Sequence, residues 1–420
     1  MNKHPGALTL ILLLAAATSL SQFYRVSNSV IGPELASELG LSAREFGLAG
    51  GAFFFALMVA QIPVGMAFDR WGARLTLSAV SGLAVIGALG IAHAENATAL
   101  ISARFLVGLG CSASFMSAVY LCSRWFGVQR FMLVLSWVFA MSNAGTLAAA
   151  TPLAWAAQTI GWRNAFVGLA LLTALIAVLF FALVRDDPPG VVPAPRQRET
   201  LSQVWSGLLE VWRTPGLGPI LAMHTFAYAS MVTVLGVWAG PYLHDVYGLD
   251  AVTRGNVLFA MGLAQIAGAL SFGPLDRIFG TRKKIVIAGA LASIAIYGAL
   301  GLIVQPPLEL TVGLLMGIPF LSSYALLLVA QGRALFPDRI AGRGVTTVNM
   351  AQVMGATLLP ALTGYLVGAL SAVEGDTTIA GAISITAPES AYRAVFALLA
   401  IASLAGLLVY LRSKDSRPQG

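Results

Sequence analysis

Gly65-Met-Ala-Phe-Asp-Arg-Trp-Gly-Ala-Arg74 is a short charged break between two long apolar runs. Gly273-Pro-Leu-Asp-Arg-Ile-Phe-Gly-Thr-Arg282 repeats its pattern of glycine, aspartate and arginine in the second half of the chain, with one residue of slip. Self-similarity of this kind indicates that the same structural unit occurs twice. The two stretches therefore predict a fold of two related halves, each with a charged turn at the same place.

Two further pairs of segments support the repeat. Ile31–Ala43 matches Ala239–Ala251 at an offset of 208 positions. Trp162-Arg-Asn-Ala-Phe166 returns as Tyr392-Arg-Ala-Val-Phe396, where the offset has grown to 230. The larger offset places an insertion in the polar stretch 371–390. We expect residues 1–184 and 218–420 to form the two halves, with 185–217 as the linker between them.

The composition predicts an all-α, polytopic membrane protein. The chain has 420 residues, of which 58% are hydrophobic and 10% are charged, and its mean hydropathy is +0.82. Runs of about 20 apolar residues are long enough to cross a bilayer as helices. Twelve such spans are predicted, six in each half: 8–32, 46–68, 74–93, 99–121, 132–157, 164–184, 218–242, 255–275, 285–304, 309–331, 344–370 and 391–411.

The basic residues predict the orientation of these spans. Nineteen of the 25 Lys and Arg residues fall in one set of breaks, and only four fall in the opposite set. Because cytoplasmic loops carry the excess of positive charge, we expect both termini in the cytoplasm and the chain in the cell (inner) membrane. The net charge of +7 is sorted by membrane side in this way, so it does not indicate nucleic-acid binding.

At these motifs the chain resembles the major facilitator superfamily over essentially its whole length. The break Gly65–Arg74 matches the signature of that family between spans 2 and 3, and Arg104-Phe-Leu-Val-Gly108-Leu-Gly110 is similar to its fourth-span motif. The resemblance implies two six-helix bundles that rock about a central cavity. It also implies transport rather than catalysis. No P-loop, Gly-x-Ser-x-Gly or zinc motif is present, so we expect no catalytic residue, cofactor or metal.

The signature motif is expected to gate the movement of the halves. A carboxylate at a tight turn can meet the positive end of a helix and nearby arginines, and such a contact can form in one conformation and break in the other. The alternative is that its arginines only set the topology. The predicted gating residues are Gly65, Asp69, Arg70, Gly72 and Arg74, with Asp276 and Arg277 in the second copy.

Arg25 is the candidate centre of a substrate site. Helical spacing places it on one face of the first span with Thr18, Gln22 and Ser29. A charged side chain in a bilayer costs about 2.5 to 3.5 kcal/mol on insertion scales, so it normally faces a cavity or a partner. The alternative is an arginine that reaches the headgroups or anchors a neighbouring helix.

The surroundings of Arg25 in the sequence predict an anionic substrate. None of the 18 acidic residues falls in the middle of a predicted span, so Arg25 has no obvious partner at its depth. The organophosphate–phosphate antiporters of the family place a second Arg symmetrically in span 7, but the repeat maps Arg25 onto Thr233 here. A carboxylate, which one guanidinium can bind bidentately, is therefore expected before a phosphate ester.

Other polar side chains complete the predicted site. Tyr228, Tyr324, Asn349 and Gln352 are expected to join Arg25, Gln22 and Ser29 in contacting the substrate, although each alone is more often a helix–helix hydrogen-bonder. His224 and Glu34 are candidates for proton coupling, and Glu34 could instead pair with Arg25 if the first span bends at Pro33. Arg104 is expected to have a structural or relay role.

The sequence thus predicts a monomeric secondary transporter in the lipid bilayer that moves a small organic anion, either in exchange for another anion or coupled to protons. Two other functions stay open. One is a proton-coupled exporter of drugs or metabolites, and the other is a sensor on the same fold that does not transport. Flux into vesicles, compared with binding alone, distinguishes the sensor from the carriers.

Overall fold

The computed structural model describes residues 6–126, 128–188, 209–337, 341–373 and 387–415. Helices are the only regular secondary structure within these ranges. In the first half they are α1 (Ala7–Val30), α2 (Gly32–Leu39), α3 (Ala43–Ala92), α4 (Ala97–Cys111), α5 (Ala113–Trp125), α6 (Val128–Ala148), α7 (Thr151–Ile160) and α8 (Trp162–Leu183). In the second half they are α10 (Leu217–Thr233), η1 (Val234–Trp238), α11 (Ala239–Tyr247), α12 (Ala251–Phe272), α13 (Leu275–Phe279), α14 (Lys283–Leu302), α15 (Leu308–Leu321), η2 (Ser322–Tyr324), α16 (Ala325–Ala334), α17 (Ala341–Val373) and α18 (Glu389–Tyr410).

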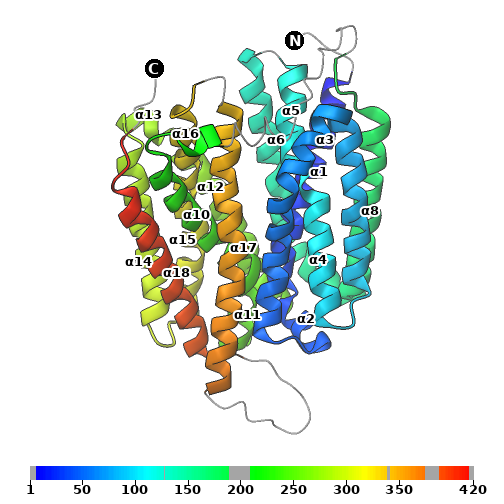
Figure 1. Ribbon diagram of the computed structural model, residues 1–420. Coiled ribbons are helices and arrows are strands. Elements are labelled where there is room, and N and C mark those ends of the chain that lie inside the picture. Colours follow the sequence, from blue (N-terminus) through cyan, green and yellow to red (C-terminus); the bar gives the residue numbers. More distant parts are fainter. Residues whose placement is uncertain (1–5, 127, 189–208, 338–340, 374–386, 416–420) are drawn as a thin grey trace.

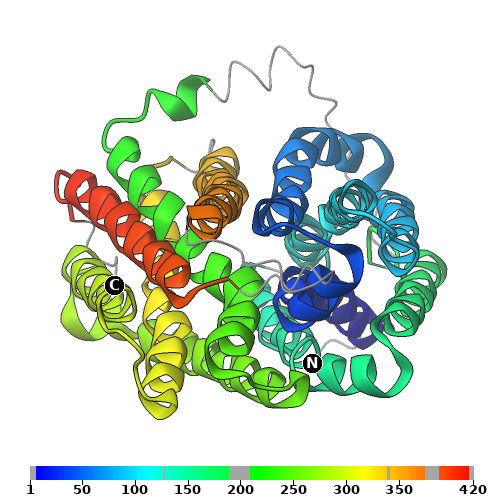
Figure 2. The same cartoon turned by 90° about the horizontal axis from the view of Figure 1, so that it is seen from below.

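The helices form two bundles that stand side by side, α1 to α8 in one and α10 to α18 in the other (Figures 1 and 2). The start of α1 and the end of α18 lie at the same end of the molecule, which we call the terminal face (Figure 1). Helices α2 and α11 lie at the opposite end, which we call the far face. Most of the predicted linker, residues 189–208, lies outside the described residues, as does most of the predicted insertion in 371–390.

Eleven helices in the described part of the chain are long and apolar enough to cross a membrane, against the twelve spans predicted. The difference lies in α3, which covers two predicted spans in 50 residues. A straight helix of that length would measure about 75 Å, far more than the roughly 30 Å of a bilayer core. Gly72 interrupts α3 with φ 82° and ψ 171°. Only glycine adopts this backbone conformation without strain.

The two bundles share one hydrophobic core toward the far face. This cluster includes Phe46 and Phe53 of α3 from the first half, and Trp238 and Leu359 from the second. Toward the terminal face each half has cores of its own: Phe68 belongs to a cluster built only from the first half, whereas the clusters of the second half contain no residue of the first. The described halves are therefore packed against one another by apolar burial mainly at the far face.

The sequence repeat reappears as a repeated set of contacts at the far face. In the first half, the indole Nε1 of Trp162 donates to Glu38 Oε2 at 2.5 Å. The next residue, Arg163, pairs with the same carboxylate and donates to the carbonyl oxygen of Ala94 at 2.9 Å. This aromatic–arginine clasp ties the start of α8 to α2 and to the end of α3.

The second half has a matching clasp. The hydroxyl of Tyr392 donates to Asp245 Oδ2 at 2.5 Å, and Arg393 donates to the carbonyl oxygen of Gly301 at 3.1 Å. It ties the start of α18 to α11 and to the end of α14. Because the repeated sequence segments make equivalent contacts, the internal repeat extends to individual hydrogen bonds.

A second repeated feature lies at the terminal face. Asp186, just after α8, accepts a hydrogen bond from the backbone of Arg74 at 2.8 Å. Asp415, just after α18, accepts from the backbone of Arg282 at 3.2 Å and from Lys283 at 3.0 Å. Although partial burial opposes it, hydrogen bonds from Thr281 and these backbone groups hold the pKa of Asp415 below its ordinary value. Each half therefore ends on an aspartate that secures its signature turn.

Candidate functional site

Arg25 of α1 and Tyr228 of α10 meet across the boundary between the two halves. The guanidinium Nη1 donates to the tyrosine hydroxyl at 2.8 Å. Both side chains are only partly buried, although each lies inside a long apolar helix. The two residues are 203 positions apart in the chain, so the fold brings together two residues that the sequence analysis selected separately.

The guanidinium of Arg25 has hydrogen-bonding capacity to spare. Its Nε is buried and has no partner. The ring of Phe54 lies 5.9 Å from its carbon, which provides a weak cation–π contact. No ion pair within the described residues includes Arg25. Because a buried donor without an acceptor is costly, this arrangement favours an anion that supplies the missing acceptor.

A second polar group lies on α10 and α17. His224 precedes Tyr228 by one turn of α10, so the two share a helix face. Both ring nitrogens of His224 are buried without a well-formed hydrogen bond, and Gln352 of α17 is a polar neighbour. Gln352 in turn donates to Asn349 at 2.5 Å. The predicted residues of α10 and α17 thus form one polar strip beside the Arg25–Tyr228 pair.

Three of the residues predicted to contact the substrate differ in their burial and in their contacts. Gln22 is half-buried one turn before Arg25, on the same face of α1. Ser29 is fully buried, and its hydroxyl accepts a hydrogen bond from Gly240 N at 3.0 Å, which joins α1 to α11. Tyr324 is buried in a core cluster of the second half, and its ring lies against Gly289. The contacts of Ser29 and Tyr324 are therefore with protein.

Close contact between the halves also explains why the residue opposite Ser29, Gly240, is a glycine. A Cβ built on Gly240 would lie 1.7 Å from the Ser29 carbonyl oxygen. Any larger residue there would push α1 and α11 apart. The short π-helical turn η1 directly precedes this contact, and such turns are frequent at functional sites.

Glu34 does not pair with Arg25. Its carboxylate instead accepts from Arg254 Nη2 of α12 at 2.5 Å, which links the two halves at the far face. Arg254 also donates to the carbonyl oxygen of Leu249 at 2.8 Å, and its side chain is only 2% exposed. In the sequence, Arg254 is one of the four basic residues in the less basic set of predicted breaks, so a solvated loop charge was the expectation. Its place at the start of an apolar run was the available signal, because such a charge needs a partner.

Arg104 is held inside the first half. Its Nη1 donates to the Tyr24 carbonyl oxygen at 2.9 Å and its Nε to that of Ala49 at 3.4 Å. The side chain is fully buried, and the Phe53 ring lies 5.5 Å from its carbon. Arg104 therefore ties α4 to α1 and α3, the arrangement of a structural residue.

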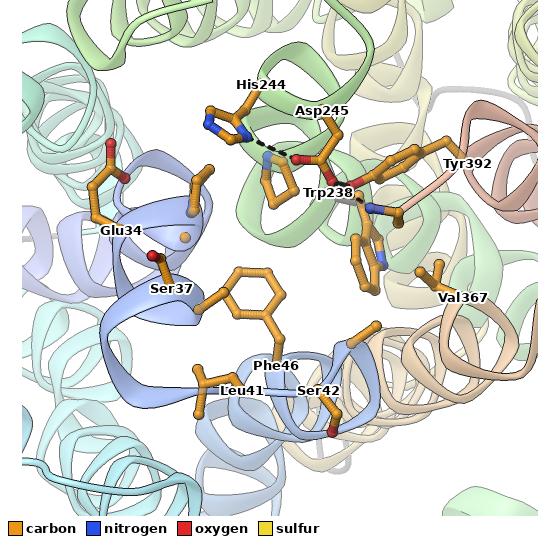
Figure 3. A pocket seen from close by; sticks show the side chains of 16 residues that line it. Glu34, Ser37, Leu41, Ser42, Phe46, Trp238, His244, Asp245, Val367 and Tyr392 are labelled. Carbon is orange, nitrogen blue, oxygen red and sulfur yellow. Dashed lines mark hydrogen bonds and ion pairs between the residues drawn. The ribbon is translucent and has the colours of Figure 1, made fainter. Parts of the chain in front are cut away.

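A pocket of ≈ 320 Å³ opens at the far face between α2, α11 and the start of α18 (Figure 3). His244 Nδ1 lies 2.7 Å from Asp245 Oδ1 at its edge, and Tyr392 reaches the same carboxylate. Glu34 and Phe46 line the pocket from the first half. This pocket was not predictable from the sequence, because its lining comes from segments that are separated by up to 360 residues.

The predicted gating residues lie at the terminal face. Asp69 and Arg70 stand just before the break at Gly72. Arg74 donates through Nε to the Phe181 carbonyl oxygen at 2.6 Å, and Gly65 packs near Met116. In the second copy, Asp276 pairs with Arg282 at 2.9 Å, whereas Arg277 is exposed.

Comparison with known proteins gives a consistent picture. Residues 11–275 and 239–420 match the profile of the Major Facilitator Superfamily. The "Probable L-galactonate transporter" of Escherichia coli (strain K12) is 26% identical over 416 residues, covering 90% of this chain and 88% of the relative. The "Hexuronate transporter" of Bacillus subtilis (strain 168) is 22% identical and covers 92% and 94%. The "Probable galactarate/D-glucarate transporter GudP" of the same strain is 24% identical and covers 90% and 89%.

Solved structures show the same fold. A bacterial homologue of the human lysosomal transporter Spinster, in an inward-facing and occupied conformation, superposes with a TM-score of 0.77 at 17% identity, covering 98% of this chain and 97% of that one. A D-xylose–proton symporter superposes with a TM-score of 0.73 at 16% identity, covering 97% and 98%.

Proposed function

Because the chain belongs to the major facilitator superfamily, we propose that it carries a small organic anion across the membrane by alternating access of one site between its two halves. It is a multi-pass membrane transporter and not an enzyme. The single observation that carries the anion proposal is the Arg25–Tyr228 pair. An incoming carboxylate finds the unpartnered Nε of Arg25 and the hydroxyl of Tyr228 at one place.

A carboxylate suits this site better than a phosphate ester. Thr233, which the repeat aligns with Arg25, is buried and neutral, so one guanidinium faces the substrate where a phosphate clamp would need two. The relatives named above are transporters of galactonate, hexuronate and galactarate or glucarate, all of which are sugar acids. Asn349 and Gln352 add amide groups suited to hydroxyls beside a carboxylate.

The packing supports a state that is closed at the far face. The halves share a core there, and Glu34–Arg254 and Ser29–Gly240 join them. All of these contacts would have to separate when the site opens to that side. We assign the far face to the outside and the terminal face, with both chain ends, to the cytoplasm of a cell-membrane protein. With α3 counted as two crossings at the Gly72 break, the chain crosses twelve times.

The gating proposal concerns the opposite face. Asp69, Arg70 and Arg74 flank the break at Gly72, where they can hold the halves together in one state and release them in the other. Asp276 and Arg282 form the corresponding pair in the second half. Nineteen of the 25 Lys and Arg residues fall in the predicted loops of this face, and their positive charge then serves both topology and gating.

Purified protein in detergent and in proteoliposomes tests the function. Galactonate, glucuronate and glucarate are expected to raise the thermal midpoint and to enter vesicles, whereas gluconamide, which lacks the charge, is not. Arg25→Ala removes charge-assisted hydrogen bonds worth roughly 3 kcal/mol together, so uptake is expected to fall about a hundredfold. Arg412→Ala, an exposed arginine after α18, is the matched control. Wild-type uptake by the Arg25→Ala protein would overturn the proposal, and binding without flux would indicate a sensor.

A further inference from the structure

Within the described parts of the chain, no acidic side chain forms an ion pair with Arg25. The sequence has 18 acidic residues. Fourteen lie in described parts, and each stands in a short helix, in a connection, or within three residues of an end or break in a long helix. The other four, Glu199, Asp338, Glu374 and Asp376, fall outside the described residues. The charge of Arg25 is therefore not neutralised by any described carboxylate.

Arg25 and Arg104, two arginines inside helices of the first half, differ in whether their surroundings change when the halves move. All the groups that hold Arg104 belong to α1 and α3, in its own half, so its surroundings stay the same. Arg25 is held by Tyr228 of the other half, so its surroundings change as the site passes from one side to the other. Each time the site passes from one side to the other, the guanidinium of Arg25 must therefore be desolvated again.

With the anion function above as its premise, we propose that the protein is an obligatory anion exchanger. When the site is closed to both sides, an empty carrier holds the guanidinium of Arg25 away from water without a counterion, which is costly. A bound carboxylate supplies that counterion. The loaded carrier therefore changes sides readily, whereas the empty carrier does so slowly, and each inward passage of an anion is followed by an outward one.

None of the titratable groups near the site can replace the bound anion as the counterion of Arg25 by changing its protonation. They are Tyr228, His224 and the buried thiol of Cys111, which lies about two helical turns from Arg104 on α4 and within electrostatic range of Arg25. A carboxylic acid beside Arg25 could balance the loss of a bound anion by releasing its proton, because it then changes from a neutral to a negative form. Protonation of His224 adds a positive charge to a site that already has one, so it cannot neutralise Arg25.

Radiolabelled galactonate taken up by proteoliposomes tests the exchange. Vesicles loaded with unlabelled galactonate are compared with empty vesicles, each with and without an inward proton gradient. Uptake is expected to be at least about tenfold faster into loaded vesicles, which corresponds to about 1.4 kcal/mol in the barrier, and not to respond to the gradient. Equal uptake into empty vesicles, or accumulation driven by the proton gradient, would overturn the exchange proposal. Uptake into neither kind of vesicle would instead count against the proposed function.

A designed carboxylate tests the electrostatic cause. Cys111→Asp introduces an acid within electrostatic range of both arginines, and Cys111→Asn has the same size without the charge. The Asp variant is expected to take galactonate into empty vesicles within about twofold of the loaded rate and to become sensitive to the proton gradient. The Asn variant is expected to keep the requirement for loading. An Asp variant that is folded, active and still strictly dependent on loading would show that the charge of Arg25 is not the reason. If it does not fold, the comparison of loaded and empty wild-type vesicles decides the proposal alone.

Discussion

At the scale of single residues, the contact between Arg25 and Tyr228 joins the two halves through one hydroxyl. Tyr228→Phe removes that hydroxyl and leaves the ring. Because hydrogen bonds to charged groups contribute about 1.5 to 3 kcal/mol, we expect the affinity for galactonate to fall by roughly tenfold or more. Thermal-shift titration of the purified variant with galactonate measures this affinity. Tyr365→Phe, on an exposed face of α17, is the control, and an unchanged affinity in Tyr228→Phe would place the substrate elsewhere.

The same site shows what residue patterns can and cannot predict. Arg25 was predictable because an unpaired charge in an apolar run needs an explanation. Its pairing with Tyr228 was not, because helical spacing gives the face of each helix but not the helix that covers it. Ser29 illustrates this limit: it shares the face of Arg25 in the sequence, yet its hydroxyl is bonded to Gly240 of the other half.

At the scale of helices, the break in α3 depends on one glycine. Gly72→Ala forces alanine into a conformation that costs roughly 1 to 3 kcal/mol, so we expect a lower thermal midpoint in detergent. Gly82→Ala, later in the same helix, has ordinary backbone angles and open space around it. That control is expected to be neutral or slightly stabilising. Equal midpoints for the two variants would mean that the break at residue 72 does not persist in solution.

The ion pair between Glu34 and Arg254 is expected to hold α2 against α12. Glu34→Ala leaves a buried arginine without its acid, which disfavours the closed far face by roughly 1 to 3 kcal/mol. A single cysteine at Val237, buried between the halves, is then expected to react about tenfold faster with an impermeant maleimide, in a background without Cys111 and Cys122.

Glu38→Ala provides the comparison for that experiment, because the partners of Glu38 all belong to its own half. It is expected to lower stability without changing the reactivity at position 237. If Glu34→Ala and Glu38→Ala raise the maleimide reaction rate of Val237→Cys equally, the change is a general loosening of the protein rather than opening of the far face.

At the scale of the whole molecule, the sequence predicted a helical membrane protein of the superfamily, and this prediction is confirmed. Hydropathy predicted twelve segments, whereas the described part of the chain has eleven helices long and apolar enough to cross a membrane. The reason is that an apolar window cannot show whether a helix continues through a turn such as the one at Gly72. The packing of one half on the other was not predictable, since it depends on contacts between segments with no local pattern in common.

That packing makes a prediction for the whole transport cycle. Gly240→Val places side-chain atoms where the carbonyl of Ser29 lies, so the far face cannot close as described. We expect exchange in proteoliposomes to be lost while the protein remains folded in detergent. Gly218→Ala, a helical glycine of α10 with open space around it, is expected to keep wild-type exchange. Normal exchange by Gly240→Val would show that this contact is not part of the cycle.

The clasps described for the two halves have a consequence for biosynthesis. The first half closes its own clasp through Trp162 and Arg163 and ends on Asp187, which pairs with Arg124 at 2.6 Å. All of these groups have been made when about 230 residues are still to be translated. At about 5 to 20 residues per second, the first bundle has roughly 10 to 50 seconds to assemble before the second is complete. The order of synthesis thus gives the second bundle a finished surface on which to fold.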